Sequence, residues 1–316
     1  MKIRFPMREI LLPLFLFAVA LSSSPSAFAQ GTPWIAEPRT GSVSVSFFNQ
    51  NAKEFYRGTE TVKGPLAATD ASLGQNTVWI GANYALSDAV ALDLQTGWAQ
   101  SYVDGAVGPS GGEENYSGLY DTQLSLTWRF ADELVDDLPS LAIRFGVTIP
   151  GGYDTGYINS LGDGGRSIEW SLIAGKFWSI GGISGEAGFR QRGSTSINTS
   201  AVGAMEGVDV DIPAEIFANI WVFVPLGNRF RLAGNYRFTN ATSGIDIGGE
   251  GFSPSRFPAL EEDQHILGGQ LFVDLFSSIS AHGFFGNVIG GRNTAKSTIF
   301  GFGLSTTFGG GFGSGF

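Results

Sequence analysis

Ionisable side chains recur at alternate positions in several stretches of the sequence, where apolar residues separate them. Because successive side chains of a β-strand point to opposite faces, this spacing gathers the charges on one face of a sheet. Charges of both signs are present. If the sheet closes around an interior, we predict that most of these charges form ion pairs that cross and fill that interior and that a minority line a solute path. The lumen-lining candidates are Asp93, Asp121, Arg129, Arg144, Glu186, Arg190, Glu215, Arg231, Arg237 and Asp274.

The two histidines are the side chains best suited to acid–base chemistry at neutral pH. A barrel hydrolase would need a histidine beside a serine, with an orienting group on the same face. His282 and Ser280 lie at alternate positions of one predicted strand, but no third group at a matching spacing completes such a site. The chain has no cysteine, so a zinc ion would also lack ligands. We therefore predict that the protein is not an enzyme and has no catalytic residue, metal or cofactor.

The stretch Ile212–Val224 is apolar on both faces, which makes its orientation ambiguous. Phe217, Trp221 and Phe223 fall on the face opposite Ile216, Ile220 and Val222. An aromatic lumen wall formed by these rings would suit an apolar or aromatic solute. The alternative is that the rings belong to a membrane-interface girdle or to packing, and the sequence leaves both interpretations open.

The elements that must position these residues are best seen in the stretch Leu119–Phe130, where apolar and polar side chains alternate. This pattern predicts a strand with two different faces. We expect one face, with Leu124, Leu126, Trp128 and Phe130, to contact lipid, and Tyr120 to lie on that same face near the outer membrane interface. Asp121, Gln123 and Arg129 should then point to the lumen.

About twelve segments of roughly ten residues show this period-two alternation, as in outer-membrane barrels. Short and long connections alternate between them, which is typical of a barrel with periplasmic turns and extracellular loops. The sequence therefore predicts an all-β fold, a single antiparallel transmembrane β-barrel of about 12 strands. The segments lie near Gly41–Asn49, Thr77–Leu86, Val90–Tyr102, Leu119–Phe130, Leu141–Ile149, Ser167–Trp178, Ile183–Arg192, Ile212–Val224, Phe230–Thr239, Gln264–Phe276, Ile279–Val288 and Thr298–Phe308. In Ser167–Trp178, Lys176 shares a face with tryptophans, which indicates either an interface position or a bulge.

Residues 1–29 have the form of a secretory signal peptide, with basic residues, an apolar run from Ile10 to Leu21 and small residues up to Ala29. We expect residues 30–308 to form the barrel and residues 309–316 to form a glycine- and phenylalanine-rich tail. The formal net charge of −10 disfavours nucleic acid as a partner. The 46 glycines and 26 phenylalanines fit glycine-bearing strands and aromatic girdles.

A strand that ends in a Pro-Gly turn, Arg144–Gly152, precedes a glycine-containing loop, Leu161–Gly164, and then another strand. This layout resembles the outer-membrane barrels assigned to the meta pathway of phenol degradation. The resemblance covers most of the chain after residue 29 in layout and implies a small-molecule transporter. It carries over no catalytic residue.

These observations predict a porin-like barrel in the outer membrane of a Gram-negative bacterium. It would pass a small solute by diffusion through a narrow lumen, with an apolar or aromatic compound as one option. The alternative is a structural or surface-interaction barrel with a closed lumen, and a barrel lipid hydrolase ranks below both. The expected partners are outer-membrane lipid, lipopolysaccharide, the barrel-assembly machinery and a small-molecule solute, with no nucleic acid.

Overall fold

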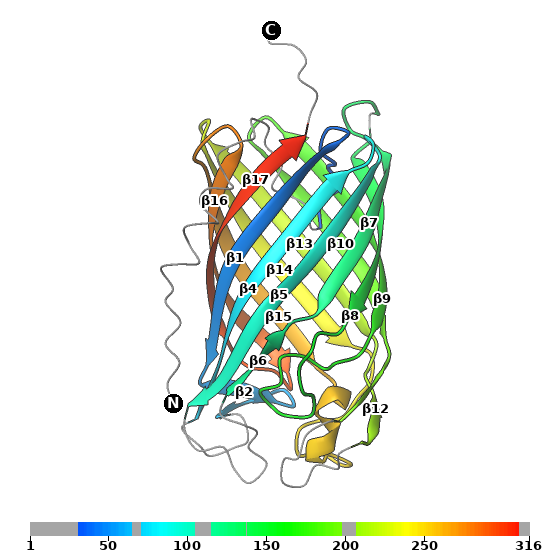
Figure 1. Ribbon diagram of the computed structural model, residues 1–316, viewed down its shortest axis with the longest axis vertical. Coiled ribbons are helices and arrows are strands. Elements are labelled where there is room, and N and C mark those ends of the chain that lie inside the picture. Colours follow the sequence, from blue (N-terminus) through cyan, green and yellow to red (C-terminus); the bar gives the residue numbers. More distant parts are fainter. Residues whose placement is uncertain (1–30, 65–70, 105–114, 137, 198–206, 310–316) are drawn as a thin grey trace.

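A computed structural model describes residues 31–64, 71–104, 115–136, 138–197 and 207–309. These residues form a closed antiparallel barrel whose strands slant around a vertical axis (Figure 1). The strands are β1 (Thr40–Ala52), β4 (Ser72–Ala85), β5 (Val90–Asp104), β6 (Asn115–Leu119), β7 (Thr122–Ala131), β8 (Ser140–Ile149), β9 (Ser167–Trp178), β10 (Gly181–Arg192), β13 (Glu215–Leu226), β14 (Phe230–Ala241), β15 (Asp263–Asp274), β16 (Ile279–Arg292) and β17 (Thr298–Gly309).

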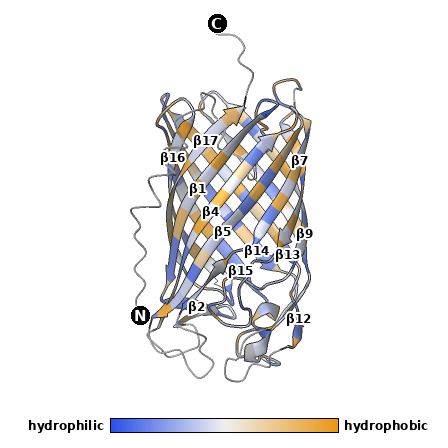
Figure 2. Cartoon of the chain, in the orientation of Figure 1, coloured by the Kyte–Doolittle hydropathy of each residue, from blue (hydrophilic) through white to orange (hydrophobic). Residues whose placement is uncertain are grey.

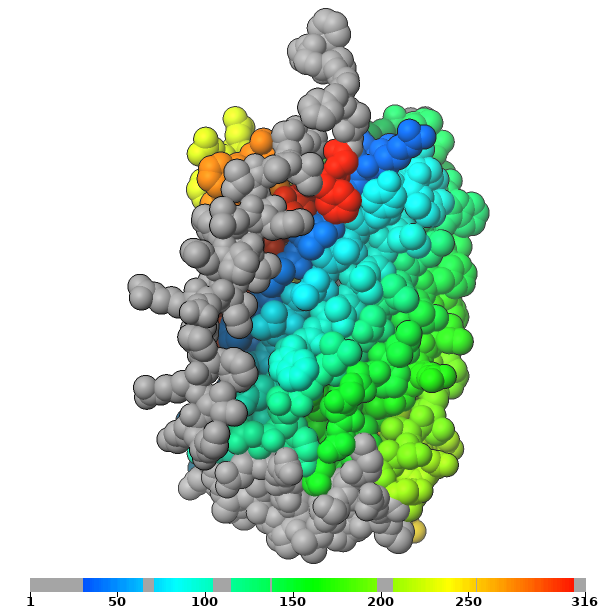
Figure 3. All heavy atoms as spheres, viewed as in Figure 1, coloured from blue at the N-terminus to red at the C-terminus, as the bar shows by residue number. Residues whose placement is uncertain are grey.

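The barrel closes by pairing its first strand with its last. Thr40 lies opposite Gly309 and Asn51 lies opposite Thr298, so β1 and β17 pair along almost their whole length. Because β6 and β7 follow one another in a single stave against β5, the ring contains 12 staves. The prediction of an all-β, 12-stranded antiparallel barrel is confirmed. Figure 3 shows neighbouring staves side by side in chain order, from blue β1 through cyan to green.

The two faces of the wall differ in the way that the alternation predicts. On β14, Leu232 points outward and is 49% exposed, whereas the neighbouring Ala233 points inward and is 2% exposed. Outward-facing aromatic and aliphatic residues continue around the barrel, among them Trp98, Trp170 and Phe302. Figure 2 shows apolar and polar positions alternating along the strands. Such an outer surface fits contact with lipid hydrocarbon, since a soluble protein rarely exposes so large an apolar area.

The stave that was predicted as one strand over Leu119–Phe130 is interrupted at Tyr120 and Asp121. The interruption reverses the orientation of the residues before it, so the expectation that Tyr120 faces lipid is wrong. Its ring lies 4.9 Å from the ring of Trp79 and packs against the buried cluster of Ala99, Tyr116 and Leu161. The cause is local, because Asp121 accepts hydrogen bonds from the loop after β8.

The connections at one end of the barrel are long and contain structure of their own. A hairpin of β2 (Glu54–Arg57) and β3 (Glu60–Lys63), a second of β11 (Ser194–Ser196) and β12 (Asp209–Asp211), and the 3₁₀ helix η2 (Pro254–Ala259) all lie at the lower end in Figure 1. Next to η2, an open pocket of about 470 Å³ is lined by η2, by residues 211–214 from the end of β12 to β13, and by residues 242–245 after β14.

Asn293 ties two of these connections together. Its backbone lies in the left-handed region at φ 51°, and its side chain accepts hydrogen bonds from the backbone N–H groups of Gly58 and Ile247. Arg292 pairs with Asp246 at 2.8 Å and, through its hydrogen bonds, holds the pKa of that carboxyl below its usual value. The long connections are therefore fixed to the barrel rim by charge-assisted bonds.

Other sequence expectations meet the structure only in part. No helix in the described part of the chain is long and apolar enough to cross a membrane. The predicted signal peptide and the tail beyond Gly309 lie outside the described residues.

Strand β9 keeps a regular register through Lys176, which pairs with Glu133 at 3.5 Å beside the short turn. The alternative of a bulge in this strand is thus wrong.

Candidate functional site: the barrel lumen

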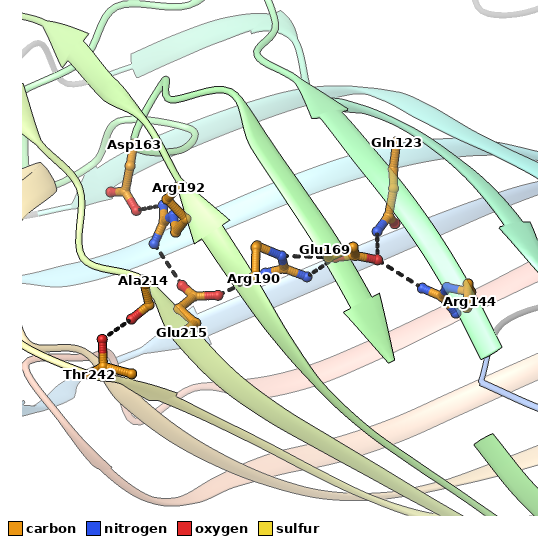
Figure 4. A network of polar contacts seen from close by, with 9 residues as sticks. All are labelled: Gln123, Arg144, Asp163, Glu169, Arg190, Arg192, Ala214, Glu215 and Thr242. Carbon is orange, nitrogen blue, oxygen red and sulfur yellow. Dashed lines mark hydrogen bonds and ion pairs between the residues drawn. The ribbon is translucent and has the colours of Figure 1, made fainter. Parts of the chain in front are cut away.

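A network of buried charges covers one side of the lumen, and we call it the charged wall: Arg144, Glu169, Glu186, Arg190 and Glu215, on β8, β9, β10 and β13. Glu169 lies at its centre, 2% exposed, and accepts hydrogen bonds from Gln123 at 2.7 Å, Arg190 at 2.9 Å and Arg144 at 3.2 Å (Figure 4). Arg144 also pairs with Glu186 at 3.3 Å, and Ser171 donates to the same carboxylate at 2.6 Å. These ion pairs join strands on one side of the lumen. We had predicted ion pairs that cross the lumen, so the arrangement of the charged wall differs from that prediction.

The glycine opposite Glu169 explains how the network fits into the wall. In register, Gly146 of β8 faces Glu169 of β9, and a Cβ atom at Gly146 would lie 2.7 Å from Glu169 Cγ. Absence of a side chain there lets the carboxylate lie flat between two arginines. Buried charges are tolerated only when each is paired and hydrogen-bonded, and this arrangement meets that condition for Glu169.

The charged wall continues to the mouth of the barrel near the long connections. Glu215 accepts from Arg190 at 2.8 Å and from Arg192 at 2.6 Å, and Arg192 also pairs with Asp163 (Figure 4). Glu262 lies close to this group and receives a hydrogen bond from Thr294 at 2.8 Å. Burial, with the nearby Asp163 carboxylate, raises the pKa of Glu262 to about 7.

The other predicted charges also lie on the inner face or at the barrel ends. Arg129 pairs with Asp132 at 2.8 Å and Arg231 pairs with Asp274 at 3.0 Å, both at the end with short turns. Asp93 is buried and accepts a hydrogen bond from Asn83 at 2.8 Å.

Asp121 and Arg237 differ from these rim pairs. Asp121 accepts from Gly151 N–H at 3.1 Å and from the Tyr153 hydroxyl at 2.6 Å. Burial, together with this carboxylate, raises the pKa of Tyr153. Arg237 points inward, is exposed to the lumen and has no hydrogen bond or ion pair with any residue that the structure describes.

On the opposite side of the lumen, rings and glycines form an apolar patch that we call the aromatic–glycine wall: Phe48, Gly268, Phe284, Gly286 and Gly301, on β1, β15, β16 and β17. Polar residues of the same inner face, among them Ser46 and His282, border this patch. The rings of Phe48 and Phe284 lie 5.8 Å apart. A Cβ atom at Gly268 or Gly286 would come within 2.7 or 2.9 Å of the Phe284 ring, and one at Gly301 within 2.6 Å of Phe48. The glycines therefore let the rings lie flat along the wall, and both residues stay partly exposed although they point inward.

Phe217, Trp221 and Phe223 all point into the barrel, but they do not form one continuous surface. Arg190 lies over the Phe217 ring, with its guanidinium carbon 5.4 Å from the ring centroid. Phe223 is buried 5.1 Å from the Phe177 ring, in a cluster with Ala233 and Phe272. Trp221 lies between the two, and its indole N–H is buried without a partner in the described part of the chain.

The segment before β1 runs inside the barrel. The carbonyl of Gly31 accepts a hydrogen bond from Ser184 Oγ at 2.8 Å, and Trp34 donates to Glu133 at 2.8 Å. The ring of Trp34 contacts Phe177 at 4.1 Å and Phe223 at 5.3 Å. Residues 31–34 thus occupy lumen space beside β9, β10 and β13, from the short-turn end inward.

The two histidines lie on different faces of the barrel. His265 faces outward and accepts or donates one hydrogen bond with the Tyr236 hydroxyl at 2.7 Å, beside the Phe238 ring. His282 faces the lumen, 3.1 Å from Ser46 Oγ. In the described residues, no group of three or more histidine, cysteine, aspartate or glutamate side chains is placed to hold a metal ion.

Several lumen residues were missed by the sequence reasoning. Glu169 alternates with Ile168 and Trp170, so the period-two rule could have found it. Phe48 and Phe284 each belong to a Phe-Phe pair, in which alternation places one ring inside and one outside without saying which. Residues 31–34 have no periodic pattern, and no signal in the sequence places them in the lumen.

Comparison with known proteins identifies the fold. No family model and no curated protein matches the sequence, so the resemblance to the meta-pathway barrels stays a prediction. Among solved structures, the chain is similar to the COG4313 outer membrane channel from Pseudomonas putida F1, with a TM-score of 0.69 and 13% identity over 90% of this chain and 99% of that one. It is also similar to the translocator domain of the autotransporter NalP from Neisseria meningitidis, with a TM-score of 0.53 and 12% identity over 86% and 89% of the two chains. At these identities, the likeness shows a shared barrel architecture.

Proposed function

We propose that this protein is a bacterial outer-membrane barrel that passes a small, apolar or aromatic solute by diffusion. The observation that supports this most directly is the aromatic–glycine wall. Phe48 and Phe284 point inward yet remain partly exposed, as does the neighbouring Gln270, so space remains beside them inside the ring. An apolar wall offers such a solute a favourable surface at about 25 cal/mol per Å² of contact area.

The charged wall supports the same proposal from the other side. Nearly all of its carboxylates and guanidinium groups are paired with each other, so they present few free charges of one sign to an ion. Ion selectivity needs lumen charges of mainly one sign near a constriction. One of the similar structures, that from Pseudomonas putida F1, is an outer membrane channel, which fits a passage function.

A matched pair of substitutions tests passage through the lumen. Gln270 points inward and Leu271 points outward with 42% exposure, so Gln270→Trp adds an indole to the lumen and Leu271→Trp adds one to the lipid face. We expect Gln270→Trp to lower the uptake of a neutral aromatic fluorophore, phenylnaphthylamine, by cells with intact lipopolysaccharide. Leu271→Trp should leave uptake unchanged. The proposal fails if uptake does not depend on the protein, or if both variants behave alike.

A closed structural barrel is the second candidate, because residues 31–34 and the charged wall both occupy lumen space. Conductance in a planar bilayer separates the two candidates. Steady single-channel currents that fall in Gln270→Trp favour passage. A complete lack of current, combined with uptake equal to that of cells without the protein, favours the closed barrel.

A further inference from the structure

Arg237 is the starting point, because its guanidinium group stands apart from the paired charges of the lumen. It points inward from the middle of β14 and is exposed to the lumen. In the described residues it has neither a hydrogen bond nor an ion pair. Arg144, Arg190 and Arg192, in contrast, each form ion pairs with two carboxylates. An arginine has five N–H donors, and because Arg237 is exposed to the lumen these donors are open to a solute there.

Two further unused donors lie beside Arg237 on the inner face. Asn219 of β13 is directly opposite Arg237 in register, and Trp221 is two positions along the same strand, on the same face. The Asn219 side-chain oxygen accepts from Asn235 at 3.2 Å, which leaves its amide nitrogen available as a donor. The Trp221 indole N–H is buried with no partner among the described residues. We call Asn219, Trp221 and Arg237 the donor patch.

The chemistry of the donor patch fits an anion. All three groups donate, none of their free atoms accepts, and one carries a fixed positive charge that can bind a carboxylate through two parallel bonds. Arg144 and Arg190 also lie within electrostatic range, but both are paired with carboxylates of the charged wall, so the charge available to an anion is that of Arg237. Glu186 is also within range, and Arg144 and Ser171 bind one of its carboxylate oxygens, Oε1.

The surroundings of the donor patch fit an apolar tail. On its other side, Arg237 faces Ile266 of β15, which is buried, and the next position inward on β15 is Gly268 of the aromatic–glycine wall. On β13, Phe217 lies two positions from Asn219 on the same face. A ligand whose carboxylate reached Arg237 could therefore lay an aromatic or alkyl group past Gly268 toward the partly exposed Phe284 ring.

Gly31 borders the donor patch on the short-turn side. A Cβ atom at Gly31 would lie 3.0 Å from Glu186 Oε2, 3.6 Å from Asn219 Nδ2 and 3.7 Å from Trp221 Nε1, so the Glu186 carboxylate lies on this side of the patch and leaves the Arg237 side for a solute. The glycine thus approaches both donors without covering Arg237. A solute that arrived from the long-connection end would reach Arg237 before it reached residues 31–34.

We propose that the donor patch binds the carboxylate of an amphipathic solute, an aromatic or alkyl carboxylic acid, and so makes the barrel prefer such acids over neutral compounds of the same shape. This rests on the proposed passage function and narrows its substrate class. Binding is non-covalent: the carboxylate loses hydrating water as it accepts hydrogen bonds from Arg237.

Equilibrium binding to the purified full-length protein tests this assignment. The probes are phenylbutyrate and phenylbutanol, which differ in the carboxylate, and acetate, which lacks the apolar tail. We expect phenylbutyrate to bind more tightly than either of the others. Arg237→Gln should weaken phenylbutyrate binding by about ten- to a hundredfold, as for a lost charge-assisted bond, and leave phenylbutanol binding unchanged. Trp221→Phe should give a smaller loss.

Arg231→Gln is the matched control, because Arg231 lies on the same strand but pairs with Asp274 at the rim. It should leave phenylbutyrate binding unchanged, and Arg237→Lys should give an intermediate affinity since it keeps the charge and loses the two-pronged geometry. Equal affinities for the acid and the alcohol, equal affinity for acetate, or equal losses in Arg231→Gln and Arg237→Gln would each overturn the proposal. If phenylbutanol still enters while the acid shows no preference, the passage function stands and only the donor patch is refuted.

Discussion

The two sides of the lumen are held in place by different interactions. The charged wall is held by ion pairs between neighbouring strands, with Glu169 joined to Arg144 and Arg190. The aromatic–glycine wall is held by rings that lie over glycines, as Phe284 does over Gly268 and Gly286. The first gains rigidity from directional bonds, and the second gains a smooth surface from close packing. The difference indicates which side can be altered without loss of the fold and which side a solute can use.

The largest expected effect comes from the centre of the charged wall. Glu169→Gln keeps the size of the side chain but removes the charge that Arg144 and Arg190 share. We expect the free energy of unfolding to fall by about 3–5 kcal/mol, the usual cost of breaking a buried ion pair from one side. Urea denaturation in detergent micelles or lipid vesicles measures it.

The control for Glu169→Gln is Asp274→Asn, which removes one partner of an ion pair at the barrel end, where Asp274 is 31% exposed. Its expected cost is below about 1 kcal/mol, as for partly exposed pairs. Equal costs for the two variants would mean that the charged wall does not stabilise the barrel more than a rim pair does.

The aromatic–glycine wall should respond to added volume. Gly286→Ala places a Cβ atom 2.9 Å from the Phe284 ring and 3.1 Å from the Leu267 carbonyl oxygen, so we expect a cost of about 1–3 kcal/mol. Gly283→Ala on the same strand is the control, since its Cβ would lie 4.0 Å from the nearest heavy atom. The same denaturation measurement compares them, and Phe284→Leu should partly restore the stability of Gly286→Ala. A similar cost at both glycines would refute the packing account.

The smallest effect concerns pH at the mouth of the charged wall. The pKa of Glu262 is raised to about 7, so the folded protein binds a proton more tightly there than the unfolded chain, whose glutamate titrates near 4.5. This contribution to stability is present at low pH and is lost as the pH rises from about 4.5 through about 7. We therefore expect the free energy of unfolding to decrease across that range and Glu262→Gln to flatten the decrease. An unchanged slope in the variant would contradict the assignment.

Much of the barrel could be predicted because one physical rule, the alternation of side chains across a strand, governs most of the wall. The rule placed Leu232 outside and Ala233 inside, and it gave the number of staves. It failed at Tyr120, because the hydrogen bonds of Asp121 with Gly151 and Tyr153 come from a loop whose path no periodicity describes.

The lumen was less predictable than the wall. Alternation states which side chains point inward, but not which partners they meet, and so the pairing of Glu169 with two arginines needed the register of three strands. The sequence also did not show that Arg237 lacks an ion-pair partner among the described residues, since its sequence pattern is the same as that of the other inward-facing arginines. Residues 31–34 gave no signal because their position depends wholly on tertiary contacts.

The contacts of residues 31–34 have a consequence for the order in which the protein is made. Gly31 bonds to Ser184, 153 positions later in the chain, and Trp34 bonds to Glu133, 99 positions later. The contact with Glu133 needs the turn after β7 and the contact with Ser184 needs β10, whereas β1, which directly follows the segment, must pair with β17 at the far end of the chain. The segment can therefore be held in place only after about half of the staves have formed, and protection of residues 31–34 from a protease would distinguish such barrels from earlier assembly states.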